Sequence, residues 1–107
     1  ITIGSNTAVR GGIPGSSVYA MSKAAVAGLV REVALELAPR GITVNNVQPG
    51  PTETDITAGY LEMLHQRVPL GRVAQPAEIA SLVSWIAGPD AGYMTGSSLT
   101  IDGGWIL

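Results

Sequence analysis

The order of short and long apolar segments constrains the fold of this chain more than any other feature. Short runs rich in β-branched residues, typical of strands, occupy residues 1–5, 41–49 and 97–104. Longer apolar segments, which we expect to be helices, occupy residues 17–38, 58–67 and 75–88. Strands that alternate with helices pack into a parallel sheet with right-handed connections. We therefore expect an α/β fold with three parallel strands, equivalent to half of a doubly wound sheet.

Expected burial follows from the same pattern. The first strand is apolar on both faces, which favours a strand that the rest of the protein covers on both sides. In the second strand we expect Ile42, Val44 and Val47 to face the interior, and Trp85 should pack against the sheet from the last helix. The helix at residues 17–38 is apolar almost all round. Its own sheet and a neighbouring subunit or further helix should therefore bury it on two sides.

Composition and charge exclude several classes of function. With 46% hydrophobic and 13% charged residues the chain is too apolar to be disordered, and its net charge of −2 argues against a nucleic-acid surface. The sequence has no cysteine and a single histidine, His65, which leaves no residues for a zinc site. No apolar run approaches the roughly 20 residues that span a bilayer. We expect a soluble, cytoplasmic protein that binds neither nucleic acid nor membranes.

The first residues, ITIGS, contain no methionine and no polar lead-in, and they have the character of a buried strand. We interpret residues 1–107 as part of a single longer domain. Such a piece would depend on further residues to cover its apolar surface.

Tyr19 and Lys23, the only lysine, are the strongest candidates for chemistry. Residues four apart share a face of a helix, so both would project together at the sheet edge where α/β proteins bind ligands. A phenol has an ordinary pKa of about 10, and a nearby ammonium group favours its charged form, so such a pair suits a general acid. Ser5 ends the first strand at the same edge, where it could donate a hydrogen bond to a substrate oxygen. In the simplest alternative, Tyr19 covers the core and Lys23 extends from its helix into water.

Four segments together carry a resemblance to a known family. The tyrosine and lysine lie in YAMSKAA, the serine ends ITIGS, a Pro-Gly loop follows a strand in GITVNNVQPGPTETDI, and GRVAQPAEIASLVSWIAG leads to the ending TIDGG. In this combination the chain resembles the C-terminal part of the short-chain dehydrogenase/reductase family, most of all its 3-oxoacyl-carrier-protein reductase-like members. The resemblance implies the C-terminal portion of an NAD(P)-binding Rossmann fold. It also implies an oxidoreductase that transfers hydride between a nicotinamide cofactor and a carbonyl or secondary alcohol.

The resemblance further implies a role for each motif residue. Ser5 would bind and polarise the substrate carbonyl, Tyr19 would act as general acid and base, and Lys23 would bind the nicotinamide ribose and assist the tyrosine. Tyr19 and Lys23 thus also count as cofactor-binding residues. The cofactor would be NADP or NAD, with NADP slightly favoured. The Pro-Gly loop would lie against the nicotinamide, with Pro49, Gly50, Thr52 and Thr54 at the matching positions.

Two features of the family are missing from the sequence. It contains no G-x-G-x-x-G phosphate loop, and no residue in the position that chooses between NAD and NADP. We therefore expect the 107 residues alone to be an inactive fragment of a reductase. The remaining alternative is a non-catalytic member of the fold that binds a nucleotide or has a regulatory role.

The last expectations concern the substrate and assembly, and they too rest on the resemblance. Residues 55–68 would close over a small carbonyl or alcohol substrate, with Tyr60, Met63 and Leu64 lining an apolar pocket and His65 exposed. The helix at residues 17–38 and the tail around Trp105 would join subunits into a homodimer or homotetramer.

Overall fold

A computed structural model describes residues 1–11 and 13–107. Its sheet contains three parallel strands in the order β1 (Thr2–Ile3), β2 (Asn46–Pro49) and β3 (Ser98–Ile101). The predicted parallel sheet is therefore confirmed, although every strand is shorter than its apolar run.

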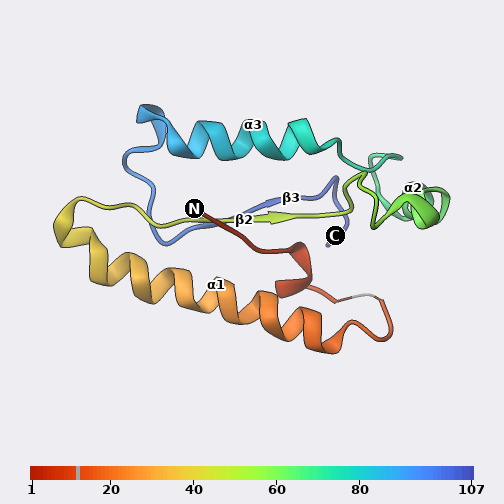
Figure 1. The fold of residues 1–107 in the computed structure, drawn as a ribbon, viewed down its shortest axis with the longest axis horizontal. Coiled ribbons are helices and arrows are strands. Elements are labelled where there is room, and N and C mark those ends of the chain that lie inside the picture. Colours follow the sequence, from red (N-terminus) through yellow and green to blue (C-terminus); the bar gives the residue numbers. More distant parts are fainter. Residues whose placement is uncertain (12) are drawn as a thin grey trace.

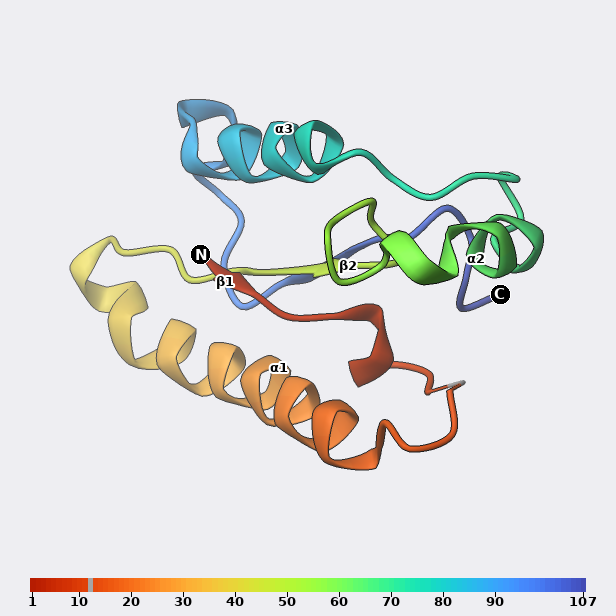
Figure 2. The same ribbon diagram turned by 45° about the vertical axis from the view of Figure 1, so that its right-hand side comes forward.

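Helices cover both faces of the sheet, as a doubly wound fold requires. Helix α1 (Ser17–Leu37) crosses one face and α3 (Pro76–Ala87) crosses the opposite face (Figures 1 and 2). Helix α2 (Leu61–Arg67) lies beyond the carboxyl end of β2 (Figure 1). The other helical segments are the short turns η1 (Asn6–Ala8), η2 (Ala38–Arg40), η3 (Ala58–Tyr60) and η4 (Pro89–Ala91).

The ends of α1 lie close to their predicted positions. The helix begins after Ser16, whose hydroxyl donates to the Ile13 carbonyl at 2.6 Å and does not cap the helix. At the other end α1 passes into η2, which contains Pro39, and the chain turns at Gly41 with a φ of 70°. A positive φ favours glycine, so this residue ends the helical segment.

The core lies between the sheet and its helices. Its buried apolar side chains are Val30, Ala34, Val47, Leu64, Val68, Val73, Ile86 and Ala91. Val47 of β2 is fully buried because β2 is the central strand. On α1, Val30 and Ala34 are buried within this chain, and burial of the second side of the helix by a neighbouring subunit or further helix stays a prediction.

Three expectations of burial are wrong, each for an identifiable reason. Ile3 is 50% exposed because β1 is an edge strand, with no partner on its outer side among the described residues. Ile42 is exposed because it precedes β2 and lies outside the sheet. Trp85 is 45% exposed, and its neighbour Ile86 is the buried side chain of α3.

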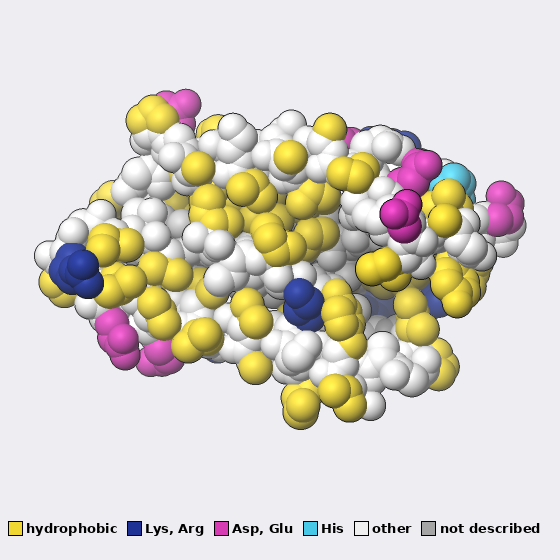
Figure 3. All heavy atoms as spheres, viewed as in Figure 1, with side chains coloured by type: hydrophobic (Ala, Val, Ile, Leu, Met, Phe, Trp, Pro, Cys, Tyr) yellow, Lys and Arg dark blue, Asp and Glu magenta, His cyan; other side chains and the backbone are white. Residues whose placement is uncertain are grey.

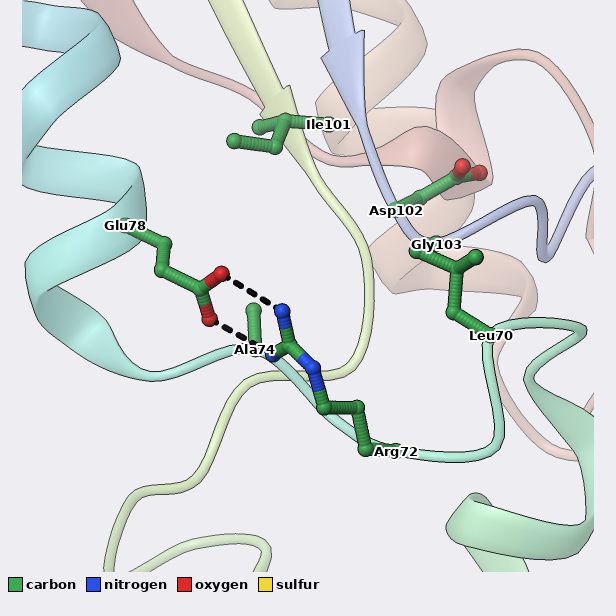
Figure 4. Close-up of a pocket in the computed structure, with 7 residues that line it drawn as sticks. All are labelled: Leu70, Arg72, Ala74, Glu78, Ile101, Asp102 and Gly103. Atoms are coloured by element: carbon green, nitrogen blue, oxygen red, sulfur yellow. Dashed lines mark hydrogen bonds and ion pairs between the residues drawn. The ribbon is translucent and has the colours of Figure 1, made fainter.

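An ion pair fixes the start of α3 (Figure 4). The Arg72 guanidinium donates two hydrogen bonds of 2.7 Å to the Glu78 carboxylate, and the Gln75 backbone N–H donates a third of 2.8 Å. The Arg72 hydrogen bonds and then that of Gln75 lower the pKa of Glu78 from 4.5 to about 2. The carboxylate thus pairs with a cation and satisfies a backbone N–H at the helix N-terminus.

This ion pair predicts a pH-dependent stability. The pKa of Glu78 is lower in the folded protein, so its stabilisation is present above its ordinary value of 4.5 and is lost as the pH falls towards about 2. In thermal unfolding, Glu78→Gln should melt below the wild type at neutral pH, and the difference should shrink below pH 4.5. When Arg72→Gln is already present, the further substitution Glu78→Gln should lower the melting temperature much less at neutral pH. A Glu78→Gln deficit of constant size down to pH 2 would contradict this role of the ion pair.

In residues 1–11 and 13–107, no helix is long and apolar enough to cross a membrane. Within the same residues, no group of three or more histidine, cysteine, aspartate or glutamate side chains could hold a metal ion.

Candidate functional site

The carboxyl ends of the three strands meet at one edge of the sheet. Ile3, Val47 and Leu99 are register partners, and β2 and β3 stay paired as far as Pro49 and Ile101, so the chain leaves the three strands at neighbouring points of this edge. The loops that leave this edge contain Ser5, the segment from Gly50 to Thr54, and the turn at Asp102. Helix α1 begins near the same edge and packs against η1. The residues predicted for chemistry therefore come from adjoining elements.

Tyr19 and Lys23 share one face of α1, as their spacing predicts. The Lys23 ammonium lies 5.7 Å from the centre of the Tyr19 ring, and the phenol is 49% exposed. Lys23 Nζ also donates a hydrogen bond of 3.0 Å to the carbonyl oxygen of Ile3. This bond links α1 to the edge strand. The ammonium group of Lys23 therefore lies beside Ile3, which precedes Ser5 by two residues in the sequence. The alternative in which Lys23 extends freely into water does not describe this side chain.

Ser5 is buried, and it lies just past β1 at the N-terminus of η1. Its Oγ accepts hydrogen bonds from the backbone N–H of Thr7 at 3.2 Å and from the Thr7 hydroxyl at 2.9 Å. Its own proton has one acceptor among the described residues, Oδ1 of Asn6, at 3.5 Å. Because that contact is long, the hydroxyl proton remains available to a closer oxygen.

The Pro-Gly loop leaves the end of β2 in a tightly fixed conformation. Gly50 donates a backbone hydrogen bond of 2.9 Å to Ile101, and a Cβ on Gly50 would lie 2.5 Å from the Cβ of Asp102. Thr52 Oγ1 donates to the Gly50 carbonyl at 3.0 Å. Thr54 is exposed, and its backbone N–H donates to the Thr57 hydroxyl at 2.9 Å. Among the four predicted loop residues, Gly50 is thus the one whose position has no room for a side chain.

An apolar groove of about 610 Å³ runs between the edge strand, the end of β2 and α3. Figure 3 shows a broad band of hydrophobic side chains across this face, between α3 and α1. Its lining includes Ile3, Pro49 and Thr52 from the sheet side, and Ile79 and Val83 from α3. A flat apolar ring would fit such a surface.

The segment predicted to close over a substrate is only partly as expected. Tyr60 and Met63 are exposed, but Leu64 is buried in the core and does not line an open pocket. His65 is half-buried and borders an open pocket of about 460 Å³ with Glu53 and Arg72, so the expectation of an exposed histidine is wrong. On a helix as short as α2, one face must pack against the body of the protein.

Sequence reasoning missed three polar residues beside Ser5. Thr7 and Asn6 contact the serine directly, and Asp102 accepts a hydrogen bond of 3.2 Å from Asn6 Nδ2. Asn6 and Thr7 adjoin the serine in the sequence and could have been found there. Asp102 lies 97 residues from Ser5, and only the register of the sheet brings it near.

Comparison with known proteins identifies the class. A family model described as Enoyl-(Acyl carrier protein) reductase matches residues 1–106. The chain belongs to the short-chain dehydrogenase/reductase family, whose fold is the Rossmann-type parallel sheet seen here. The resemblance inferred from the motifs is therefore confirmed.

Similar proteins carry names that indicate different functions. The chain is 42% identical over 111 residues to the 3-oxoacyl-[acyl-carrier-protein] reductase FabG of Vibrio cholerae, covering 100% of this chain and 45% of the relative. It is 43% identical over 106 residues to a cyclic-di-GMP-binding biofilm dispersal mediator protein of Escherichia coli, covering 96% and 45%. The crystal structure of BdcA in complex with NADPH superposes with a TM-score of 0.90 at 45% identity, covering 95% of this chain and 43% of that one. The chain thus spans less than half the length of these relatives.

Proposed function

We propose that this chain is the C-terminal, proton-transferring part of an NADPH-dependent reductase that converts a ketone into a secondary alcohol. Membership of an oxidoreductase family and the 42% identity to a 3-oxoacyl reductase support this proposal. We take a 3-oxoacyl thioester as the first substrate class to test.

The observation that carries the proposal is the position of Lys23. Its ammonium group lies over the Tyr19 ring and is tied to the Ile3 carbonyl, at the sheet edge where the chain continues to Ser5. In the proposed reaction the Tyr19 hydroxyl gives its proton to the substrate oxygen, and the Ser5 hydroxyl donates a hydrogen bond to that oxygen. Tyr19 is half-exposed, so a substrate can reach it.

NADPH is the proposed cofactor, and it supplies the hydride when bound. The structure of BdcA, a protein 45% identical to this chain over 95% of this chain's length, is a complex with NADPH and supports this choice. Pro49 and Thr52 line the apolar groove and would contact the nicotinamide ring. Lys23 and Tyr19 would hold the neighbouring ribose, and Gly50 and Thr54 would shape the loop around the ring. The phosphates would need residues outside this chain, so residues 1–107 alone should be inactive.

Binding of a cyclic dinucleotide without reductase activity is the second candidate, because a relative 43% identical to this chain is named for binding cyclic-di-GMP. One experiment separates the two. The whole protein that contains this chain should consume NADPH when mixed with 3-oxoacyl thioesters or simple ketones. Calorimetry on the same sample measures cyclic-di-GMP binding. Turnover supports the reductase; binding without turnover on any carbonyl contradicts it and favours the second function.

We also propose that α1 contributes to a homodimer or homotetramer. Its outer side exposes Val18, Met21, Leu29 and Leu35, an apolar surface that water alone would cover poorly. Trp105 of the tail is half-buried, and the Arg67 guanidinium carbon lies 4.8 Å from the centre of its ring. Trp105 therefore offers less exposed surface to another subunit than α1 does.

A further inference from the structure

A side-chain hydrogen bond joins the segments that follow the two outer strands. Asn6 begins η1, just past β1, and Asp102 comes directly after β3. Asn6 Nδ2 donates to Asp102 Oδ2 at 3.2 Å. Gly50, which comes directly after β2, packs closely against Asp102. A Cβ at Gly50 would lie 2.5 Å from the Asp102 Cβ.

The Asp102 end of this bond is rigid. Its Oδ1 accepts from the backbone N–H of Gly104 at 2.9 Å, and its Oδ2 accepts from that of Ile106 at 3.2 Å. Figure 4 shows the carboxylate pointing away from the Arg72–Glu78 pair. With the turn after β3 wrapped around it, the carboxylate presents a fixed acceptor to Asn6.

The Asn6 end determines what faces Ser5. A carboxylate accepts hydrogen bonds and donates none, so Asp102 requires the NH₂ group of the Asn6 amide on its side. The amide oxygen is then turned towards the Ser5 hydroxyl, at 3.5 Å. Asn6 is buried, with 3% of its surface exposed, so water cannot easily replace either contact.

We propose that Asp102 is a positioning residue that acts through Asn6 to orient the Ser5 hydroxyl for the substrate carbonyl. The Thr7 hydroxyl and N–H occupy the acceptor side of Ser5 Oγ, and the Asn6 oxygen holds the proton loosely at 3.5 Å. An incoming carbonyl oxygen at ordinary hydrogen-bond distance accepts the hydrogen bond from Ser5 in place of the Asn6 oxygen, and the serine keeps its proton. This inference rests on the proposed reductase function.

The test uses the whole protein that carries this chain. Asp102→Asn replaces one carboxylate oxygen by an NH₂ group, so residue 102 can no longer accept from Asn6, Gly104 and Ile106 together. The Asn6 amide then loses its fixed orientation, and kcat should fall about 10-fold, less than the roughly 10²–10³-fold for loss of an oxyanion donor. The KM for NADPH should not change. Asn6→Asp places two carboxylates face to face and should lower kcat further. The exchange Asn6→Asp with Asp102→Asn restores a donor–acceptor pair and should recover most of the loss of Asn6→Asp.

Two controls distinguish a positioning role for Asp102 from a purely structural one. Asp90→Asn makes the same chemical change at an exposed residue of η4 and should leave kcat unchanged. Melting temperatures are measured for every variant. A wild-type kcat in both single variants, with or without a lower melting temperature, would overturn the inference alone, and so would an exchange variant no better than Asn6→Asp. A wild type without carbonyl reduction would overturn the proposed function and this inference with it.

Discussion

Tyr19→Phe should abolish carbonyl reduction by the whole protein and leave its fold and NADPH binding intact. The substitution removes one oxygen, the proposed proton donor, and keeps the ring beneath the Lys23 ammonium. General acid catalysis by a positioned side chain contributes about 10²–10⁴-fold, so kcat should fall by at least the lower figure. Because the side chain is half-exposed, the melting temperature should change little. Steady-state NADPH consumption measures the first effect, and a fluorescence titration with NADPH measures the second.

Tyr93→Phe is the matched control. Tyr93 lies in the exposed connection between η4 and β3, at the end of the sheet remote from the candidate site. The same oxygen is removed there, so activity should equal that of the wild type. Retention of full turnover by Tyr19→Phe would refute the role proposed for Tyr19, and the proton would then have to come from elsewhere.

The periodicity of the apolar residues, with the proline and glycine residues that bound each segment, predicted most of the fold. The pattern of strands and helices determined the parallel sheet, and Pro76 and Gly88 bracketed α3 where the structure has it. Prediction failed for burial at the edge of the sheet, where the apolar character of Ile3 says nothing about what lies beside it. Ile3 borders an open apolar groove, so its sequence reflects a neighbour that these residues do not provide.

The candidate site was predictable where its residues are neighbours in the sequence. A helical spacing of four joined Tyr19 to Lys23, and the structure places the two groups together. The bond from Lys23 to the Ile3 carbonyl was not predictable, because a backbone acceptor leaves no trace in the sequence. The role of Asp102 was not predicted for a related reason. Its contact with Asn6 depends on how the strands pair, which cannot be read from any local sequence pattern.

Gly50→Ala should be strongly destabilising for a change of a single methyl group. The new Cβ would lie 2.5 Å from the Cβ and 2.6 Å from the Cα of Asp102, and backbone atoms cannot move aside as a flexible side chain can. Either β2 or the turn after β3 must shift, and such overpacking costs about 1–3 kcal/mol. The shift would also separate Asn6 from Asp102 and displace the loop that begins at Pro49. Both the free energy of unfolding and kcat should therefore fall.

Gly28→Ala provides the comparison, because a Cβ at Gly28 meets nothing within 4 Å and the residue lies inside α1. Alanine is favoured over glycine in a helix by about 1 kcal/mol, so this variant should be more stable than the wild type. Urea unfolding should give a lower free energy of unfolding than the wild type for Gly50→Ala and a higher one for Gly28→Ala. If Gly50→Ala were as stable as Gly28→Ala, the contact between the Pro-Gly loop and Asp102 would not constrain the site. If Gly50→Ala lost activity in proportion to stability alone, the loop would matter only to folding. A loss of kcat in the fully folded variant is the result expected if the two loops must meet over a glycine for the Ser5 hydroxyl to be held in place.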